Sequence, residues 1–156
     1  MLSTHSLLPK LQAAYPHFSF TAGDRFAWSP DTQTIFYDTS DPRNTNLLIH
    51  ELAHGVLEHR DYSKDVELIA METEAWDTAV VLAAKYGIPI SDGTVQDHLD
   101  TYRDWLHARS ICPACEATGY QSAKNEYTCV ACGHVWRVNE ARLCGLRRYS
   151  KRSNLR

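Results

Sequence analysis

The chain has 156 residues, of which 44% are hydrophobic and 22% are charged, and its net charge at pH 7 is −3. This composition excludes a disordered chain and a coiled coil, and the length allows one ordinary domain or a small domain with an appendage held by metal. The charge is unevenly divided, because residues 1–111 contain 8 Lys and Arg against 16 Asp and Glu while residues 112–156 contain 8 against 3, which indicates two parts with different partners.

Apolar spacing and turn residues predict five elements in the first 60 residues. They are a short amphipathic helix over residues 6–15, strands over residues 18–20, 25–29 and 34–38, and a helix from residue 42 to about residue 59. The last two strands form a hairpin around a Ser-Pro-Asp-Thr turn. Ser40-Asp41-Pro42 is a typical helix start, with proline at the first helical position.

Two longer helices are predicted next, over residues 65–86 and over residues 94–109. From Ile111 onward the chain consists of short segments rich in cysteine, glycine and aromatic residues. We therefore expect an α+β protein with a boundary near Ser110. Its parts would be a first domain over residues 1–110, a cysteine-rich module over residues 111–138 and a basic tail over residues 139–156.

No membrane partner is expected. The most apolar run, residues 79–84, has six residues, whereas a membrane-spanning helix needs roughly 20. The first residues lack the basic and apolar regions of a signal peptide. Four of the five cysteines form two Cys-x-x-Cys pairs, which without an export signal indicate metal binding rather than disulfides. We expect a cytoplasmic protein.

Residues 50–54 read His-Glu-Leu-Ala-His within a predicted helix. Because successive helical residues are rotated by about 100°, His50 and His54 lie about 40° apart on one face, and both imidazoles can reach one metal ion. Glu51 lies at the flank of that face, where it can take a proton from a zinc-activated water. The pattern predicts a catalytic Zn²⁺ with Glu51 as general base and then acid. The alternative is two surface histidines on an amphipathic helix.

A catalytic zinc ion needs a third protein ligand. His59 lies about 140° around the helix from His54, so we expect it to be an exposed residue. On the next helix, Glu67 and Glu74 share a mostly polar face, whereas Glu72 stands in the middle of an apolar one. A carboxylate in that position is strongly unfavourable unless its charge is compensated, and a zinc ion would compensate it. We therefore predict Glu72 as the third ligand.

Together the two motifs resemble the ImmA/IrrE-type metallopeptidases, in which HExxH precedes a motif similar to E-x-E-A-N-x-x-A. This chain has Glu72-Thr-Glu-Ala-Trp-Asp-Thr-Ala, and the resemblance covers about residues 26–84. It implies a minimal zincin fold of helices on a small antiparallel sheet, with Glu72 as the ligand, and a cytoplasmic peptidase that cleaves repressor-like DNA-binding regulators. Trp76 stands where the family usually has Asn, a polar residue that supports the site.

The cysteine pairs predict a second, structural Zn²⁺. Each Cys-x-x-Cys turn offers two thiolates, and two turns complete a tetrahedral Cys₄ site in a small zinc ribbon whose folding energy comes from the metal. The alternative is a redox dithiol, which would normally use one pair in a thioredoxin-like unit. Cys144 and His134 are not expected to bind the ion. The predicted ligands are Cys112, Cys115, Cys129 and Cys132.

Basic residues follow the second cysteine pair, with aromatic residues between them. This combination suits phosphate contacts and base stacking, so we predict DNA contact through the C-terminal module; the alternatives are a solvated tail and a clamp onto the acidic first domain. A zincin followed by a zinc ribbon also resembles the SprT-like proteases, although their third ligand is a downstream histidine. The candidate contacts are Trp136, Arg137, Arg142, Arg147 and Arg148, with Tyr149, Lys151, Arg152 and Arg156 nearby.

These patterns favour a small zinc endopeptidase acting on a protein substrate, which the hairpin over residues 26–38 could bind through an edge strand. A different class fits the same motifs, namely a DNA-binding regulator that keeps the zincin fold without turnover. A mobile-element factor such as a toxin or antirestriction protein is a third possibility. The natural substrate and the oxyanion-stabilising residue have no sequence signal.

Overall fold

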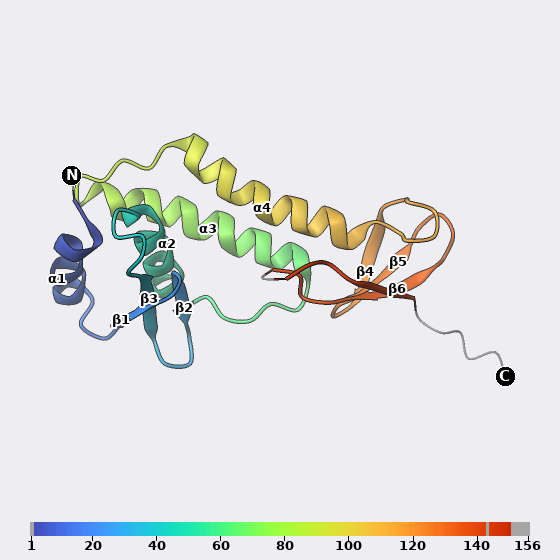
Figure 1. Cartoon of the computed structure of the whole chain (residues 1–156), viewed down its shortest axis with the longest axis horizontal. Coiled ribbons are helices and arrows are strands. Elements are labelled where there is room, and N and C mark those ends of the chain that lie inside the picture. Colours follow the sequence, from blue (N-terminus) through green and yellow to red (C-terminus); the bar gives the residue numbers. More distant parts are fainter. Residues whose placement is uncertain (1, 143, 151–156) are drawn as a thin grey trace. The chain divides into compact units, whose positions relative to one another are not determined.

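The computed structural model describes residues 2–142 and 144–150 (Figure 1). Its contacts divide the chain into two compact units, each described by itself below. Unit 1 comprises the residues up to 61 together with residues 70–95, and unit 2 comprises residues 62–69 together with those from 96 onward. The predicted α+β class is confirmed, and no helix among the described residues is long and apolar enough to cross a membrane.

Unit 1 is built on a three-stranded mixed sheet with the order β1-β3-β2. The strands are β1 (Ser19–Gly23), β2 (Ala27–Ser29) and β3 (Thr34–Asp38). The predicted hairpin is present as the antiparallel pair of β2 and β3, whereas β1 runs parallel to β3. Strand β2 therefore lies at an edge of the sheet. Helix α1 (Thr4–Ala14) precedes the sheet, and its first turn is closed by a capping box between Ser3 and Ser6.

The core of unit 1 lies where helix α2 (Thr45–Val56) contacts β2 and β3. Ile35 of β3 and Leu48 and Leu52 of α2 are completely buried. The helix begins three residues later than the sequence predicted, because the side chain of Asn44 accepts a hydrogen bond from the Leu47 N–H at 3.2 Å and acts as the N-cap.

The end of α2 also differs from the prediction, which extended the helix to about residue 59. Leu57 is the C-cap, and Glu58 has a left-handed backbone with φ of 57°. The N–H of His59 donates to the carbonyl of His54 at 3.0 Å. This pattern is typical of a helix terminated by a left-handed residue, and it turns the chain away from the helical path before His59.

Helix α3 (Asp65–Ala84) presents the predicted apolar stripe, in which Ala75, Trp76, Ala79 and Ala83 are buried in unit 1. The chain then passes Gly87, whose φ is +68°, and the N–H of Ile88 donates to the carbonyl of Ala83 at 3.0 Å. The left-handed glycine that the sequence predicted after the helix is therefore present. The helix itself ends at Ala84, two residues before the predicted end at residue 86.

Unit 2 consists of the start of α3, most of helix α4 (Asp92–Ser110) and a four-stranded antiparallel sheet with the order β4-β5-β6-β7. The strands are β4 (Gly119–Ala123), β5 (Glu126–Cys129), β6 (Val135–Val138) and β7 (Arg148–Ser150). Strand β7 belongs to the segment that was predicted as a basic tail. The domain boundaries predicted from the sequence stay a prediction, although part of the tail pairs with the ribbon sheet.

Close packing in unit 2 requires glycine at position 119. A Cβ atom there would lie 2.6 Å from the Trp136 ring and 2.7 Å from the carbonyl oxygen of Thr128. Trp136 itself is fully buried, and its ring stacks on Tyr127 with the centroids 5.9 Å apart. The rest of this core is Cys112, Cys129 and Val138.

A buried ionic network holds the start of α3 to the ribbon within unit 2. Arg109 and Asp65, 1% and 2% exposed, form an ion pair with Nε and Oδ2 2.8 Å apart. The Tyr127 hydroxyl donates to the same carboxylate oxygen at 2.6 Å. Burial and this hydrogen bond to Asp65 raise the pKa of Tyr127. The other donors of Arg109 are taken by Asn125 and by the carbonyls of residues 139 and 140.

Candidate metal centres

The predicted ligands of the first metal site come together in unit 1. His50 and His54 lie on α2 and Glu72 lies on α3, and the three residues are 4%, 7% and 6% exposed. The His50 Nε2 atom is 2.9 Å from Oε2 of Glu72, and the His54 Nε2 atom is 3.1 Å from Oε1. The two Nε2 atoms are 3.1 Å apart. The prediction that the Glu72 side chain lies beside His50 and His54 is therefore confirmed.

These three residues fit a zinc ion by donor chemistry and by spacing. Two imidazole nitrogens and a carboxylate are a common ligand set for catalytic zinc, and ligands at about 2.1 Å in a tetrahedron lie about 3.4 Å from one another. The observed separations of 2.9–3.1 Å are close to that value. Within this cluster the described residues supply three ligands, which leaves a fourth tetrahedral position for water or substrate.

Electrostatics explains why a carboxylate is tolerated in this core. Burial alone would raise the pKa of Glu72, but the hydrogen bonds from His50 and His54 outweigh it and hold the pKa well below its usual range. Burial likewise tends to lower the pKa of His54, yet the hydrogen bond to Glu72 and the charges of Glu72 and Glu51 raise it. The site is therefore an anion compensated by positive charge, and a divalent cation can replace the protons.

Trp76 supports the site by packing rather than by a polar contact to the ligands. Its ring stacks on the His50 imidazole, with centroids 4.1 Å apart and an angle of 21° between the planes. Trp76 is 1% exposed, so the His50 ring is held against a fixed surface. The sequence analysis noted only that Trp76 replaces a supporting polar residue of the family, and it did not foresee this aromatic contact.

Glu51 follows the first ligand on α2 and is partly buried beside the edge strand. Burial raises the pKa of its carboxyl to about 7; His54 opposes the shift, Glu72 adds to it, and a hydrogen bond from the Trp28 backbone N–H of β2 opposes it. Gly55 permits this close packing, since a Cβ there would meet the Trp28 ring at 3.0 Å and the Phe18 ring at 3.2 Å. The absence of a side chain at Gly55 thus lets the Trp28 and Phe18 rings pack against the α2 backbone.

The expectation that His59 is exposed was wrong. Its Nδ1 atom lies 2.9 Å from Nδ1 of His54, and its Nε2 atom lies 3.3 Å from Oε2 of Glu74. The His59 side chain is 10% exposed, while that of Glu74 is 61% exposed, as its polar face predicted. The third candidate carboxylate, Glu67, instead accepts a hydrogen bond from the Ser63 N–H at 3.0 Å. Neither Glu67 nor His59 joins the ligand cluster.

The second predicted site lies in unit 2 and contains the four predicted cysteines. The Cys112 and Cys132 sulfurs are 3.7 Å apart and those of Cys115 and Cys129 are 3.5 Å apart. Sulfurs at about 2.3 Å from a tetrahedral zinc lie about 3.8 Å from each other, so the four thiols fit such an ion. Cys112 and Cys129 are buried, whereas Cys115 and Cys132 are exposed.

Backbone N–H groups favour the thiolate form of one cysteine of this cluster, Cys129. Hydrogen bonds from the backbone N–H groups of Cys132 and Ala131 lower the pKa of Cys129 to about 6. His134 contacts Ser150 through Nε2 at 3.2 Å, and Cys144 accepts a hydrogen bond from Asn139. Both stay outside the ligand cluster, as the sequence predicted.

The candidate nucleic-acid contacts have different environments. Trp136 is fully buried and donates its indole N–H to the carbonyl of Arg109 at 3.0 Å, so its ring is not available for base stacking. Arg142 lies over the Tyr102 ring at 3.7 Å. Arg148 donates to the carbonyl of Ile111 at 3.1 Å. Arg137 and Arg147 are exposed, whereas residues 151–156, which include the nearby Lys151, Arg152 and Arg156, lie outside the described residues.

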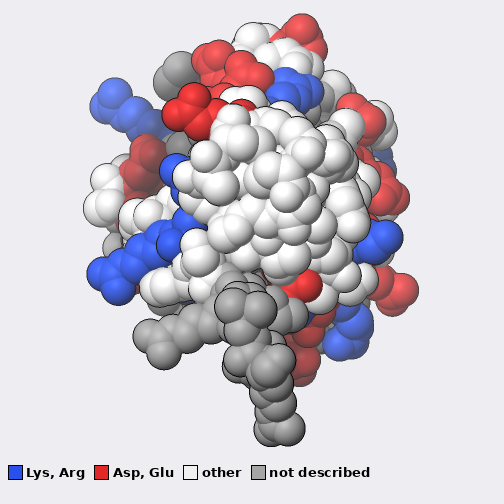
Figure 2. All heavy atoms as spheres, turned by 90° about the vertical axis from the view of Figure 1, so that its right-hand side faces the viewer, with Lys and Arg blue, Asp and Glu red and all other residues white. Residues whose placement is uncertain are grey.

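Figure 2 shows the face of the molecule at the right-hand side of Figure 1, near the β4–β6 end of unit 2. A wide area of this face has no charged side chain in view, and both basic and acidic side chains are visible around it. The exposed apolar residues of the unit include Tyr120, Val130 and Tyr149, which are 54%, 72% and 51% exposed. The surface of unit 2 therefore includes exposed aromatic and aliphatic side chains together with the exposed Arg137 and Arg147.

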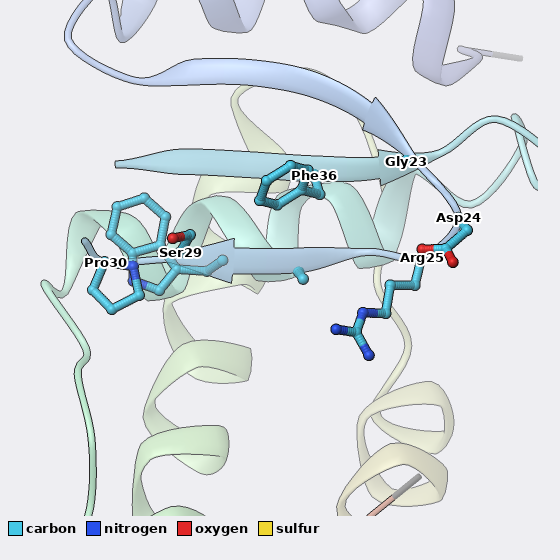
Figure 3. A pocket seen from close by; sticks show the side chains of 8 residues that line it. Gly23, Asp24, Arg25, Ser29, Pro30 and Phe36 are labelled. Carbon is cyan, nitrogen blue, oxygen red and sulfur yellow. The ribbon is translucent and has the colours of Figure 1, made fainter. Parts of the chain in front are cut away.

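Unit 1 also contains a hollow of about 390 Å³ beside β2. Figure 3 shows Phe36 in its middle, Ser29 and Pro30 toward one end, and Asp24 and Arg25 toward the other. Two small residues flank Phe36: Ala27 is its cross-strand partner, and Gly23 lies beside its ring. Its lining residues are Gly23, Asp24, Arg25, Ala27, Trp28, Ser29, Pro30 and Phe36.

No family model, no curated protein and no solved structure matches the chain. The interpretation of both centres therefore depends on the residues themselves, on their spacing and on their chemistry.

Proposed function

We propose that this chain is a zinc-dependent endopeptidase that hydrolyses peptide bonds of a protein substrate, as its resemblance to ImmA/IrrE-type metallopeptidases implies. One observation carries the proposal. A buried carboxylate, Glu72, meets the imidazoles of His50 and His54 at 2.9 and 3.1 Å. Such a set, with an open fourth position and an adjacent glutamate, is typical of zinc hydrolases.

Glu51 is the residue that handles protons in this proposal. Zinc, when bound, lowers the pKa of a water molecule to about 7 and polarises a carbonyl group. Glu51 then accepts the proton of the attacking water and returns it to the leaving amine. Its raised pKa of about 7 suits both roles near neutral pH. His50, His54 and Glu72 hold the ion, and Trp76 fixes the plane of His50.

Strand β2 is the element best placed to bind an extended substrate. It is an edge strand of the sheet, and its Trp28 backbone N–H meets the carboxyl of Glu51. A peptide that pairs with this edge would run past the general base, because edge strands bind extended chains through main-chain hydrogen bonds. The hollow around Phe36 could receive one substrate side chain next to this strand.

The test is a comparison of purified Glu51→Gln with the unmodified chain. We expect Glu51→Gln to keep both zinc ions and to lose cleavage of an unfolded protein substrate, because it loses the base and keeps the ligands. Glu72→Gln is the matched variant on the metal side, and we expect it to lose the zinc of the His site and keep the zinc of the cysteine site. If Glu51→Gln retains full peptidase activity, Glu51 is not the base.

A non-catalytic regulator is the competing function, and the same assay separates the two. If the zinc-loaded chain shows no cleavage of any unfolded protein or repressor-like substrate, the zincin fold serves binding alone. The resemblance to ImmA/IrrE-type enzymes favours a DNA-bound regulator as the natural substrate, and a cytoplasmic location follows from the same resemblance as a proposal.

For the ribbon we propose contact with single-stranded nucleic acid through the open face of the β4–β7 sheet. Arg137 of β6 pairs with Tyr149 of β7 and with Glu126 of β5. Two residues beyond Glu126, Thr128 pairs with Tyr120 of β4, so Tyr120 and Tyr149 lie on the same face of the sheet as Arg137. Tyr120 and Tyr149 are both about half exposed. Exposed aromatic rings beside arginine suit base stacking and phosphate contact. In this proposal Tyr120 and Tyr149 take the role that was predicted for Trp136.

Fluorescence anisotropy with a labelled single-stranded oligonucleotide tests this surface at several salt concentrations. We expect binding that weakens steeply with salt, and a loss of about fivefold or more in Tyr149→Leu because stacking contributes about 1–3 kcal/mol per base. Lys85→Ala, an exposed cation of unit 1, is the control. Salt-independent binding, or equal losses in both variants, would instead favour a solvated tail.

A further inference from the structure

On the side away from the candidate metal site, His54 contacts a row of two further side chains. Its Nε2 atom faces Glu72, and its Nδ1 atom lies 2.9 Å from Nδ1 of His59. The other ring nitrogen of His59 lies 3.3 Å from Oε2 of Glu74. Three side chains from α2, the turn after it and α3 thus form one continuous row that ends at the candidate metal site.

The direction of these hydrogen bonds follows from the acceptor at the end of the row. An ionised carboxylate can only accept, so Glu74 takes the Nε2–H of His59. In a neutral imidazole the other nitrogen is then an acceptor, and Nδ1 of His59 accepts from Nδ1–H of His54. This assignment leaves the lone pair of His54 on Nε2, which is the atom that faces the metal site. The row therefore selects the one tautomer of His54 that can bind a metal there.

The backbone places His59 for this contact independently of its own ring. Left-handed Glu58 ends α2, and the Trp28 indole N–H donates to the His59 carbonyl at 3.0 Å. A left-handed residue other than glycine, asparagine or aspartate is uncommon. Because these interactions involve only main-chain atoms of residue 59, a substitution of its side chain leaves the turn in place.

We propose that His59, oriented by Glu74, is a positioning residue that fixes the tautomer and ring orientation of His54 for metal binding. The inference deepens the proposed function, since it rests on a metal ion at His50, His54 and Glu72. Partners that hydrogen-bond a metal-ligating histidine typically contribute 10–100-fold to metal affinity. Here the partner is a histidine–glutamate pair rather than a single carboxylate.

The experiment measures metal affinity, not activity. Cobalt(II) is titrated into the full chain against a competing chelator, and its spectrum separates the site of nitrogen and oxygen ligands from the thiolate site. We expect His59→Leu to weaken the first site 10–100-fold. His59→Asn should recover most of that loss, because the Asn Oδ1 atom stands where His Nδ1 accepts. Glu74→Gln should lose about two- to fivefold, since an exposed charge contributes little.

Two controls and one direct observation complete the test. His5→Leu and Asp77→Asn change an exposed histidine and an exposed acid of unit 1, and their metal affinity should match that of the unmodified chain. In ¹⁵N NMR of the unmodified, zinc-loaded chain, His54 should carry its proton on Nδ1 and exchange it slowly with water. This observation does not depend on whether the variants fold.

The possible failures are distinguishable. If the unmodified chain binds no cobalt at the first site, the proposed function itself fails. If cobalt binds but His59→Leu equals the unmodified chain, or His59→Asn is as weak as His59→Leu, the positioning role is refuted. A proton on Nε2 of His54 in the NMR spectrum would refute it as well.

Discussion

Replacing Arg109 by Met should strongly destabilise unit 2. Arg109 is 1% exposed and pairs with Asp65, which is 2% exposed. Methionine fills a similar volume but cannot donate hydrogen bonds. The substitution leaves the Asp65 carboxylate buried with the Tyr127 hydroxyl as its remaining side-chain donor, and it strips the Asn125 amide oxygen and two backbone carbonyls of their arginine donors.

Breaking a buried ion pair by removing one partner costs about 3–5 kcal/mol. In a domain of about 70 residues, 1 kcal/mol corresponds to a shift of about 4–8 °C in Tm. The lower ends of both ranges together give a fall of about 12 °C. The loss is also a large part of the 5–15 kcal/mol that typically stabilises a whole domain.

The assay follows unit 2 through the zinc ion proposed for its four cysteines. Urea is added to the full chain in the presence of a metallochromic chelator, and reactivity of the cysteine thiols reports unfolding of the ribbon. Arg103→Met is the matched control, because Arg103 also lies on α4 but forms an exposed pair with Asp100 at 2.9 Å. Such exposed pairs are worth at most about 1 kcal/mol.

A loss in Arg109→Met no larger than in Arg103→Met would refute this reasoning. The double variant Arg109→Met with Asp65→Asn gives a second criterion. Because the neutral amide removes the uncompensated charge, the double variant should be less destabilised than the sum of the two single variants by about 0.5–3 kcal/mol. Strict additivity would show that the two side chains do not act together.

Two further predictions concern single sites. Zinc affinity at the His50, His54 and Glu72 site should fall by about tenfold per pH unit below the raised pKa of His54. The reason is that the ion must displace the proton of His54, while Glu72, with its lowered pKa, stays ionised. A competition titration at pH 6, 7 and 8 measures the affinity, and an affinity that does not change with pH contradicts the prediction. Gly119→Ala should destabilise unit 2 by about 1–3 kcal/mol or more through overpacking, since its Cβ would lie 2.6 Å from the Trp136 ring; Gly145→Ala, where no described atom lies within 4 Å of the added carbon, should not.

Helical periodicity was sufficient to predict which residues come together at the first candidate metal site. His50 and His54 share a face by spacing alone, and Glu72 was singled out because it interrupts an apolar stripe. The same periodicity failed for His59, since it assumed that α2 continues, whereas the helix ends at Val56 and Glu58 turns left-handed. Glu58 itself gives no warning, because that conformation is usually signalled by glycine.

In the ribbon, the cysteine spacing predicted the cluster, but the aromatic residues were misassigned. Trp136 was taken as a surface residue because it lies at the start of the basic segment that follows the second cysteine pair. Strand alternation could have corrected this, since Trp136 and Val138 are buried on one side of β6 while Arg137 is exposed on the other. The Asp65–Arg109 pair had no sequence signal, because its residues are 44 positions apart.

Strand β2 has only three residues, and this shortness bears on how selective the proposed peptidase is. A substrate peptide can form only a few main-chain hydrogen bonds with so short a strand, and each contributes a net of about 0.5–1.5 kcal/mol to binding. Binding at that level lies near millimolar and discriminates poorly among amino-acid sequences. Substrate selection would then depend on a second binding site that raises the local concentration of one protein at the metal centre, rather than on recognition of the amino-acid sequence at the cleavage site.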